Sequence, residues 1–507
     1  MLRYKTVSGN KVSDALIDEI KTLFDSSYGV WSLAYPPKQS LAGKPISFPR
    51  KNYVEYFRGS TEYGGDCDLV LCYDGGKLVG EAIYVNRDTV RGKVAIVVQL
   101  VVHDEYRRKG IGSALLYSIW GFSNYYAWGI VTSNPCTVKT LEKATARKCS
   151  VGAIIQNKNF LKKEVLANIR FLDETRDHWV VKNDGDVVES RIRTGFATSR
   201  LESSDAQRDV ESRLGRIGPQ DEWLAFIFNS QEVESDIGLQ RMLDESNLIV
   251  RDAYVRMDVD RQAWTGKTEL EVDQILKLVP SSKTSAICDF GAGEGRHLKE
   301  LKRRGFENLA GIDFVFDDKC GLVTNGDCRS WKGAQLFDLI LCLYDVVGSF
   351  RSLEDNVAII SNIFDNLKTG GKAVLSVMNL DFEGMLSSEA VCDKPDELYR
   401  KLRALKPSTN MADSGEVFDG RCALVNWDEG LVYRKEQFDG DDNRLRRELV
   451  VVDRRFTMKG IVDLCKSVGF GVLHSSYVRA GFTSPTFFQR IRASRWGKEI
   501  LLVLVKS

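Results

Sequence analysis

The stretch Thr284-Ser-Ala-Ile-Cys-Asp-Phe-Gly-Ala-Gly-Glu-Gly295 sets the architecture of the second half of this 507-residue chain. Its apolar part, Ala286–Phe290, reads as a strand and leads straight into a glycine-rich turn formed by Gly291, Gly293 and Gly295. The helical pattern Arg296–Arg304 follows. Glycine lets a ligand approach the backbone closely, so a strand, a glycine turn and a helix N-terminus together predict a nucleotide-binding loop.

Downstream of this loop, short apolar runs alternate with helical patterns. We predict strands over 309–314, 337–344 and 373–379, a helix over 353–367 and a Thr-Gly-Gly-Lys turn at 369–372. This alternation is typical of a doubly wound, Rossmann-like parallel sheet. Residues 423–458 read as an antiparallel insert, and a helix over 457–468 and a strand over 500–505 complete the pattern.

A second glycine loop, Arg107-Arg-Lys-Gly110-Ile-Gly112, lies in the first half of the chain. It follows the apolar run Val94–Val102 and opens a helix over 112–121, and a strand over 127–132 leads to Asn134-Pro135 and another helix. Upstream, two alternating runs flank Asp74-Gly-Gly76, which is a hairpin signal. These patterns predict a mixed sheet with helices.

The remaining segments are assigned to these two halves. Residues 13–25 form a predicted helix, and strands are predicted over 174–183 and 222–228. The polar stretch 229–245 reads as a linker. We therefore predict an α/β chain with an N-terminal domain over 1–235 and a C-terminal domain over 236–507.

Composition excludes several classes of protein. The chain is 43% hydrophobic and 28% charged with a net charge of +1, so no global field draws it to nucleic acid or membranes. No stretch approaches the length of a transmembrane helix, and the first residues lack the apolar core of a signal peptide. The cysteines form no C-x-x-C pair and the four histidines have no metal-ligand spacing, so we expect no metal and a cytoplasmic location.

The loop Asp289-x-Gly291-x-Gly293-x-Gly295 resembles motif I of class I S-adenosylmethionine (SAM) methyltransferases. Later segments resemble that family in the same order, through the acidic Asp313, the turn at 325–328, the strand at 337–344 and the turn at 369–372. The resemblance implies SAM as cofactor. It implies that the cofactor is bound by Asp289, Gly291, Gly293, Gly295, Asp313, Asp327, Cys328 and Leu343, and is covered by Tyr254, Arg256 and Trp264.

The same resemblance suggests where methyl transfer occurs. Tyr344 and Asp345 follow the predicted fourth strand, at the edge of the sheet where acceptors bind, and are the candidate catalytic residues. The motif Leu343–Ser349 differs from the Asn/Asp-Pro-Pro-aromatic motif of enzymes that methylate base amines, and no Pro-Cys nucleophile is present. These features favour a small-molecule acceptor.

The first loop, Arg107-x-x-Gly110-x-Gly112, resembles the pyrophosphate loop of GNAT acetyltransferases. The resemblance implies acetyl-CoA as cofactor, with its pantetheine arm at Leu100 to Val102 and near Asn134. It assigns the diphosphate to the loop residues Arg107, Arg108, Lys109, Gly110, Gly112 and Ser113. Glu81, on the neighbouring predicted strand, is the candidate base. The segment after Asn134-Pro135 lacks the Gly-aromatic pair that family members usually have.

We therefore expect a bifunctional enzyme that acetylates and methylates a polar small molecule such as an amine, an amino sugar or a peptide-like metabolite. Two alternatives stay open. Basic clusters at 302–304, 444–455 and 490–498 are consistent with a tRNA- or DNA-modifying enzyme, although the near-neutral charge does not favour one. The N-terminal domain could instead be a non-catalytic binding module. The sequence does not reveal the oligomeric state.

Overall fold

The computed structural model describes residues 2–59, 67–169, 178–185, 187–198, 204–234, 238–244, 246, 265–314, 321–392, 394–407, 420–438, 447–478 and 495–507. The chain divides into two compact units. The first is Met1–Ile249 with Lys394–Arg403 and Gln437–Leu449, and the second is Val250–Asp393 with Ala404–Glu436 and Val450–Ser507. The domain boundary between residues 235 and 236 stays a prediction. Among the described helices, none is long and apolar enough to cross a membrane.

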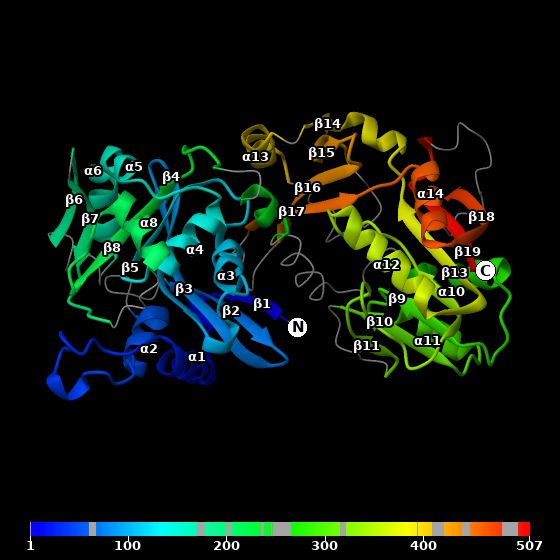
Figure 1. The fold of residues 1–507 in the computed structure, drawn as a ribbon, viewed down its shortest axis with the longest axis horizontal. Coiled ribbons are helices and arrows are strands. Elements are labelled where there is room, and N and C mark those ends of the chain that lie inside the picture. Colours follow the sequence, from blue (N-terminus) through cyan, green and yellow to red (C-terminus); the bar gives the residue numbers. More distant parts are fainter. Residues whose placement is uncertain are drawn as a thin grey trace. The chain divides into compact units, whose positions relative to one another are not determined.

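The first unit is built on an eight-stranded sheet in the order β1-β2-β3-β4-β5-β8-β7-β6 (Figure 1). Neighbouring strands are antiparallel except β4 and β5, which are parallel. The predicted hairpin is confirmed, because Asp74 pairs with Lys77 across two glycines. The strands are β1 (Leu2–Val7), β2 (Cys67–Asp74), β3 (Lys77–Thr89), β4 (Gly92–Val102), β5 (Tyr125–Thr132), β6 (Trp179–Asp184), β7 (Val187–Arg193) and β8 (Asp221–Phe228).

The helices of this unit cover the sheet with apolar faces. Ile17, Ile20 and Phe24 of α1 lie in one buried cluster with Leu69 and Ile83 of the sheet. Every residue of α3 except Gly112 is buried. The helices are α1 (Asp14–Ser27), α2 (Arg50–Arg58), α3 (Ile111–Trp120), α4 (Pro135–Thr145), α5 (Val151–Gln156), α6 (Lys158–Phe160) and α8 (Ser204–Leu214).

The segment 229–245 differs from the predicted polar linker. Residues 238–244 are helical and bury Leu239, Met242 and Leu243. These three positions have the i, i+3, i+4 spacing of an apolar helix face, which the polar residues between them obscure.

The first unit also contains two segments from late in the sequence, one of which includes most of helix α13 (Pro395–Ala404). The Tyr399 hydroxyl donates to Asn229 Oδ1 at 3.2 Å. Its ring centroid lies 4.4 Å from the guanidinium of Arg147, which is buried. A cation–π contact of this kind stabilises the unit, so its packing includes residues outside the predicted range 1–235.

The second unit contains a seven-stranded sheet in the order β11-β10-β9-β12-β13-β19-β18. The first five strands are parallel, and β19 is antiparallel to both of its neighbours. In chain order the sheet grows from β9 in one direction and from β12 in the other, so the switch point lies between them. The strands are β9 (Ile287–Phe290), β10 (Leu309–Asp313), β11 (Val323–Asn325), β12 (Phe337–Cys342), β13 (Leu367–Met378), β18 (Phe470–Val478) and β19 (Glu499–Lys506).

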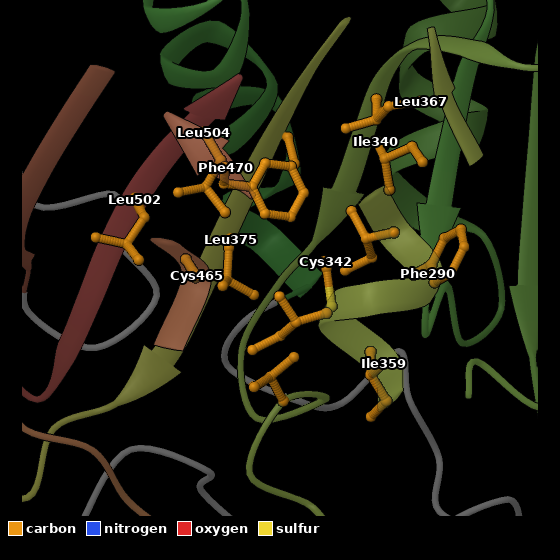
Figure 2. Packing of buried hydrophobic residues seen from close by; sticks show 14 of the residues in the cluster. Phe290, Ile340, Cys342, Ile359, Leu367, Leu375, Cys465, Phe470, Leu502 and Leu504 are labelled. Atoms are coloured by element: carbon orange, nitrogen blue, oxygen red, sulfur yellow. The ribbon is translucent and has the colours of Figure 1, made fainter. Parts of the chain in front are cut away.

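Both faces of this sheet are covered, which makes it doubly wound as predicted. Figure 2 shows one core, where Ile359 of α12 and Cys465 of α14 lie among Cys342, Leu375 and Leu502 of the strands. Alternate strand residues, including Ile287 and Leu341, form the other core with α10 and α11. The helices are α10 (Thr268–Leu278), α11 (Arg296–Arg303), α12 (Leu353–Asn366) and α14 (Met458–Val468).

The antiparallel insert is confirmed. Strands β15 (Ala423–Asn426), β16 (Leu431–Phe438) and β17 (Arg447–Arg454) form a separate sheet with the short β14 (Glu389–Ala390). The Thr-Gly-Gly-Lys turn lies within β13, whereas we predict it before the strand. Phe337 pairs with Leu367, and Leu339 pairs with Lys372. The residues between Leu367 and Lys372 therefore bulge out of the ladder while the strand continues.

Candidate active sites

Strands β4 and β5 of the first unit separate part-way along their length. They pair from Lys93 opposite Tyr125 to Val97 opposite Ile130. Beyond this point β4 continues beside β3 to Val102, and β5 continues beside β8 to Thr132. Among the described residues, the β5-facing side of β4 near Leu100 and Val102 therefore has no strand partner, which suits a ligand that forms main-chain hydrogen bonds.

The glycine loop lies just beyond this separation, at the N-terminus of α3. Gly110 is the N-cap residue with φ +84°, and a Cβ added there would meet nothing within 4 Å. Arg108 also has a positive φ of +64°. The first amides of α3, including those of Gly112 and Ser113, have no partner within the helix and point towards its N-terminus. This open, cationic loop fits the diphosphate of acetyl-CoA.

Three further predicted ligands in this unit have other contacts. The Arg107 guanidinium donates to the carbonyls of Val102 and Ser27 and pairs with Asp104. Asn134 is the N-cap of α4, and its Oδ1 accepts the Cys136 amide at 2.9 Å. Lys109 Nζ lies 4.9 Å from the Tyr106 ring centroid. Of the three loop cations, Arg108 therefore has neither an ionic nor a ring contact among the described residues.

Glu81 is completely buried on β3, one strand away from the separation. Gln99 Nε2 donates to Glu81 Oε1 at 2.5 Å and lies 3.2 Å from the Tyr53 hydroxyl. Glu81 Oε2 has no hydrogen-bond partner among the described residues. Burial raises the pKa of Glu81 to about 8, although the Gln99 hydrogen bond opposes this. A carboxyl with such a pKa can accept a proton near neutral pH.

The glycine loop of the second unit lies at the switch point between β9 and β12. Its three glycines have positive φ, +75° at Gly291, +55° at Gly293 and +73° at Gly295. The Gly293 amide donates to Asp313 Oδ2 at 2.9 Å, which connects the loop to the end of β10. Val346 Cγ2 lies 2.3 Å from the position of a Cβ on Gly291. The loop backbone therefore follows a path that needs glycine, and its place at the carboxyl ends of the strands fits the methionyl and ribose parts of SAM.

The two residues that we predict for the adenine turn have different surroundings. Asp327 forms a bidentate ion pair with Arg329, whose Nη1 also contacts Asp355 Oδ1 at 2.7 Å. This pair orients the turn. Cys328 is buried, and burial raises its thiol pKa to about 12, so the thiol is a packing group and not a nucleophile.

A buried ionic network lies beneath the glycine loop. Glu271 of α10 is fully buried and accepts from Arg296 and His297 at 2.5 and 2.8 Å. His297 Nδ1 lies 3.4 Å from Asp289 Oδ2, the predicted motif I carboxylate. Burial alone would raise the pKa of Glu271, but His297 and Arg296 outweigh it and lower that pKa. Asp289 is thus held by the protein's own network.

The candidate catalytic residue Tyr344 belongs to this network. Its hydroxyl donates to Glu271 Oε1 and accepts from Arg296 Nη2 at 2.8 Å. Its backbone has φ +66°, and its amide donates to Ser376 Oγ. Burial raises the pKa of the phenol, although Arg296 opposes this. The phenol therefore stays protonated and fixes the loop after β12; Leu343, the preceding residue, is buried in the core.

Asp345, the other candidate catalytic residue, lies in a different environment. Burial and then Asp453 raise its pKa, whereas Arg434 and Lys498 oppose the shift. Arg434 Nη2 contacts Asp453 Oδ2 at 2.5 Å. Arg455 is buried in the same group of charges, and burial lowers its pKa to about 10. Both signs of charge therefore surround Asp345 within the second unit.

Some predicted site residues are not described by the structure, and some residues of the observed network were not predicted. Tyr254, Arg256 and Trp264 lie outside the described residues. Sequence reasoning missed Glu271, Arg296 and His297. The pair Arg296-His297 directly follows the last glycine of motif I, which is a usable signal, whereas Glu271 is indistinguishable in sequence from an exposed helix residue.

These geometries define two classes of protein. The first unit has the open parallel strand pair and the anion-binding helix of an acyl-CoA-dependent acyltransferase, and the second has the switch-point loop of a nucleoside-binding α/β transferase. A model of the acetyltransferase (GNAT) family matches residues 31–120, and a model of the methyltransferase domain family matches residues 264–422. The chain is therefore an enzyme that joins a GNAT acetyltransferase domain to a SAM-dependent methyltransferase domain, with acetyl-CoA and SAM as cofactors.

A search of curated proteins finds no match to the chain. Among solved structures, it is similar to a SAM-dependent methyltransferase from Clostridium acetobutylicum, with 14% identity over 51% of this chain and 96% of that protein and a TM-score of 0.35. It is also similar to the CcbJ methyltransferase from Streptomyces caelestis, with 11% identity over 48% and 90% of the two chains and a TM-score of 0.34. The glycopeptide N-methyltransferase MtfA is 13% identical over 51% and 97%, with a TM-score of 0.31.

Proposed function

We propose that this enzyme acetylates and methylates a polar small molecule that carries an amine. The observation that supports this best is Glu81, a fully buried carboxyl whose Oε2 has no partner among the described residues, placed beside the separation of β4 from β5. An uncompensated buried carboxyl is unfavourable unless a ligand satisfies it. An ammonium group from the acceptor would do so.

In acetyl transfer, acetyl-CoA supplies the activated acyl group as a thioester. The α3 loop would hold the diphosphate, and the unpaired side of β4 would orient the arm that carries the thioester. Glu81 would accept one proton from the acceptor ammonium, which frees the nitrogen lone pair to attack the thioester carbonyl. The C–N bond would form as the C–S bond breaks, and the CoA thiolate would leave and take up the second proton that the nitrogen loses. The raised pKa of Glu81 suits this exchange, because the carboxylate must take a proton near neutral pH.

In methyl transfer, SAM supplies an activated methyl group, so alignment matters more than covalent help. The glycine loop and Asp313 would hold the cofactor. Asp345 lies at the carboxyl end of β12 among Arg434 and Lys498, and we assign the acceptor to this group of charges. A carboxylate there would bind or deprotonate an amine, and the cations would bind an acidic group of the same acceptor.

The surface charges favour a small molecule over nucleic acid. Arg303 and Arg304, in one of the basic clusters, form ion pairs with Glu300, Glu269 and Asp273. The charges of these two arginines are neutralised within the fold, so this cluster offers little positive charge to phosphates.

The experiment combines ligand titration with an amine panel. Acetyl-CoA and SAM are titrated into the full chain by calorimetry, with Gly110→Asp and Gly293→Arg expected to abolish one binding event each. Acetyl transfer is then measured over pH 6 to 9. Glu81→Gln should lower kcat about 100-fold or more and leave acetyl-CoA affinity unchanged, whereas the exposed Glu55→Gln should change neither. If Glu81→Gln retains full kcat, Glu81 is not the base; if no amine is acetylated, the first unit is a binding module.

A further inference from the structure

A second buried carboxyl, Glu222, lies on the other side of the separation of β4 and β5 from Glu81. Glu222 lies on β8, next to Trp223, which pairs with Thr132 at the end of β5. Glu81 lies on β3, where it pairs with Val101 near the end of β4. The two carboxyls therefore come from the strands that flank the opening on either side.

Tyr28 lies near enough to both carboxyls for each of them to affect the pKa of its phenol. Burial raises the pKa of the Tyr28 phenol, and the charges of Glu222 and Glu81 both add to this increase. The Tyr28 hydroxyl is therefore within electrostatic reach of both carboxyls. Glu222 accepts from the Thr194 hydroxyl and the Ser133 amide, but burial still raises its pKa to about 7.

No cation of the protein balances these two groups. Among the described residues, neither Glu81 nor Glu222 forms an ion pair with lysine or arginine, and Glu81 Oε2 has no hydrogen bond. No group of three or more described His, Cys, Asp or Glu side chains could hold a metal ion. Two buried carboxylates without a cation are costly, which is why burial raises both pKa values, and a bound cationic ligand would stabilise the ionised forms.

Aromatic rings complete the surroundings. The rings of Tyr28 and Trp31 make edge contacts with Phe196, with centroids 6.0 and 4.9 Å apart. All three side chains are partly exposed, so their faces are not fully covered by the core. Aromatic faces attract ammonium groups, and this attraction strengthens when the site excludes water.

We propose that the acetyl acceptor is a molecule with two amino groups, of the diamine class. The amine to be acetylated binds at Glu81, and the second ammonium binds at Glu222 against Tyr28, Trp31 and Phe196. This proposal rests on the acetyltransferase function proposed above and specifies its substrate. Glu222 acts as a specificity residue, because it binds the part of the acceptor that does not react.

The test compares linear α,ω-diamines of increasing length with monoamines in which a methyl group replaces one amino group. Binding to the full chain is measured by calorimetry, and acetyl transfer is measured separately. The best diamine should bind about tenfold or more tightly than its matched monoamine, since a buried charge pair contributes more than an exposed one. Glu222→Gln should remove this preference by raising KM for the diamine.

Three outcomes would overturn the proposed diamine site. Equal affinities of the wild type for diamine and monoamine would do so. An equal loss of affinity for both amines in Glu222→Gln would do so as well. Diamine acetylation that keeps the wild-type KM in Glu222→Gln would leave the acetyltransferase function intact and refute the diamine site alone. Glu222-dependent diamine binding without any acetyl transfer would refute the acetyltransferase function alone.

A binding measurement and a second variant serve as controls. Glu222→Gln must keep the acetyl-CoA affinity of the wild type, which shows that the fold is intact. Phe196→Leu removes an aromatic face without changing charge and should weaken the diamine preference about threefold to tenfold. An unchanged preference in this variant would exclude the aromatic contribution.

Discussion

His297 Nε2 lies 2.8 Å from Glu271 Oε2, and the opposite ring nitrogen lies 3.4 Å from Asp289 Oδ2. One imidazole thus connects α10 to the end of β9, next to the glycine loop for which we propose SAM binding. Burial alone would lower the pKa of His297, but its contacts with Asp289 and Glu271 outweigh burial and raise that pKa. The charged imidazolium is therefore the form that this network stabilises.

This contact predicts how stability changes with pH. Because the pKa of His297 is higher in the folded than in the unfolded state, its stabilisation is complete below the unfolded value of about 6.5. This stabilisation is lost as the pH rises through the pKa of His297 in the folded state. Replacing His297 by Gln should therefore lower the melting temperature of the methyltransferase domain strongly at pH 6 and much less at pH 9.

The measurement is calorimetric unfolding of wild type and His297→Gln at intervals across this range. The transition of the methyltransferase domain is recognised because SAM shifts it. A loss of about 2 kcal/mol would lower its midpoint by several degrees for a domain of this size. A difference in midpoint that is the same at every pH would show that the imidazole is neutral in the folded state.

Tyr344→Phe tests whether the phenol positions the loop or takes part in chemistry. Removing the hydroxyl leaves Glu271 and Arg296 with one fewer partner each in a buried site, which should cost about 1–3 kcal/mol of stability. Because the phenol is held protonated, we expect kcat for methyl transfer to fall by less than about tenfold. A loss of a thousandfold with normal SAM affinity would instead make Tyr344 a catalytic residue.

Gly291→Ala tests the geometry of the SAM loop, with Gly305→Ala as its matched control. Both residues have positive φ, +75° and +87°, so both variants carry a backbone strain of about 1–2 kcal/mol. A Cβ at Gly305 meets nothing within 4 Å, whereas one at Gly291 would clash with Val346. Titration with SAM should therefore detect no binding to Gly291→Ala and near-normal binding to Gly305→Ala. Similar affinities would mean that Val346 moves freely.

Sequence patterns predicted most of the fold because local signals and tertiary structure agree there. The helix ending at Gly469 has a capping threonine at Thr457 and a glycine with positive φ at its C-terminus, so its limits could be read directly. The strands β4 and β12 are apolar runs between turn residues. Strand β7 and helix α8 were missed, because the many charged residues in both segments mask the buried Ile192 and Val210.

The sites were less predictable, because chemistry depends on contacts between distant residues. The loops could be identified from glycine spacing alone. Glu222 could not be recognised as a site residue, since its relation to Glu81 arises only when β8 is placed beside β5. Similarly, nothing local to Arg107 shows that its guanidinium bonds to Ser27 at the end of α1.

Arg107 and Arg108 differ in their contacts, and this difference predicts different roles for the two guanidinium groups. Arg107 is held by protein carbonyls and Asp104, whereas Arg108 is exposed and has positive φ at the turn into α3. We therefore expect Arg108→Gln to weaken acetyl-CoA binding about threefold to tenfold at low salt, with a smaller effect at high salt where exposed charges are screened.

Arg107→Gln should instead lower the thermal stability of the acetyltransferase domain, because it removes the hydrogen bonds to Ser27 and Val102. Its acetyl-CoA affinity should stay within about twofold of the wild type, a difference in binding free energy below the 1.4 kcal/mol that a tenfold change requires. Calorimetric titration at two salt concentrations and a melting curve for each variant separate the two roles. If Arg107→Gln weakens binding more than Arg108→Gln without any loss of stability, the guanidinium of Arg107 must leave its protein partners to reach the diphosphate.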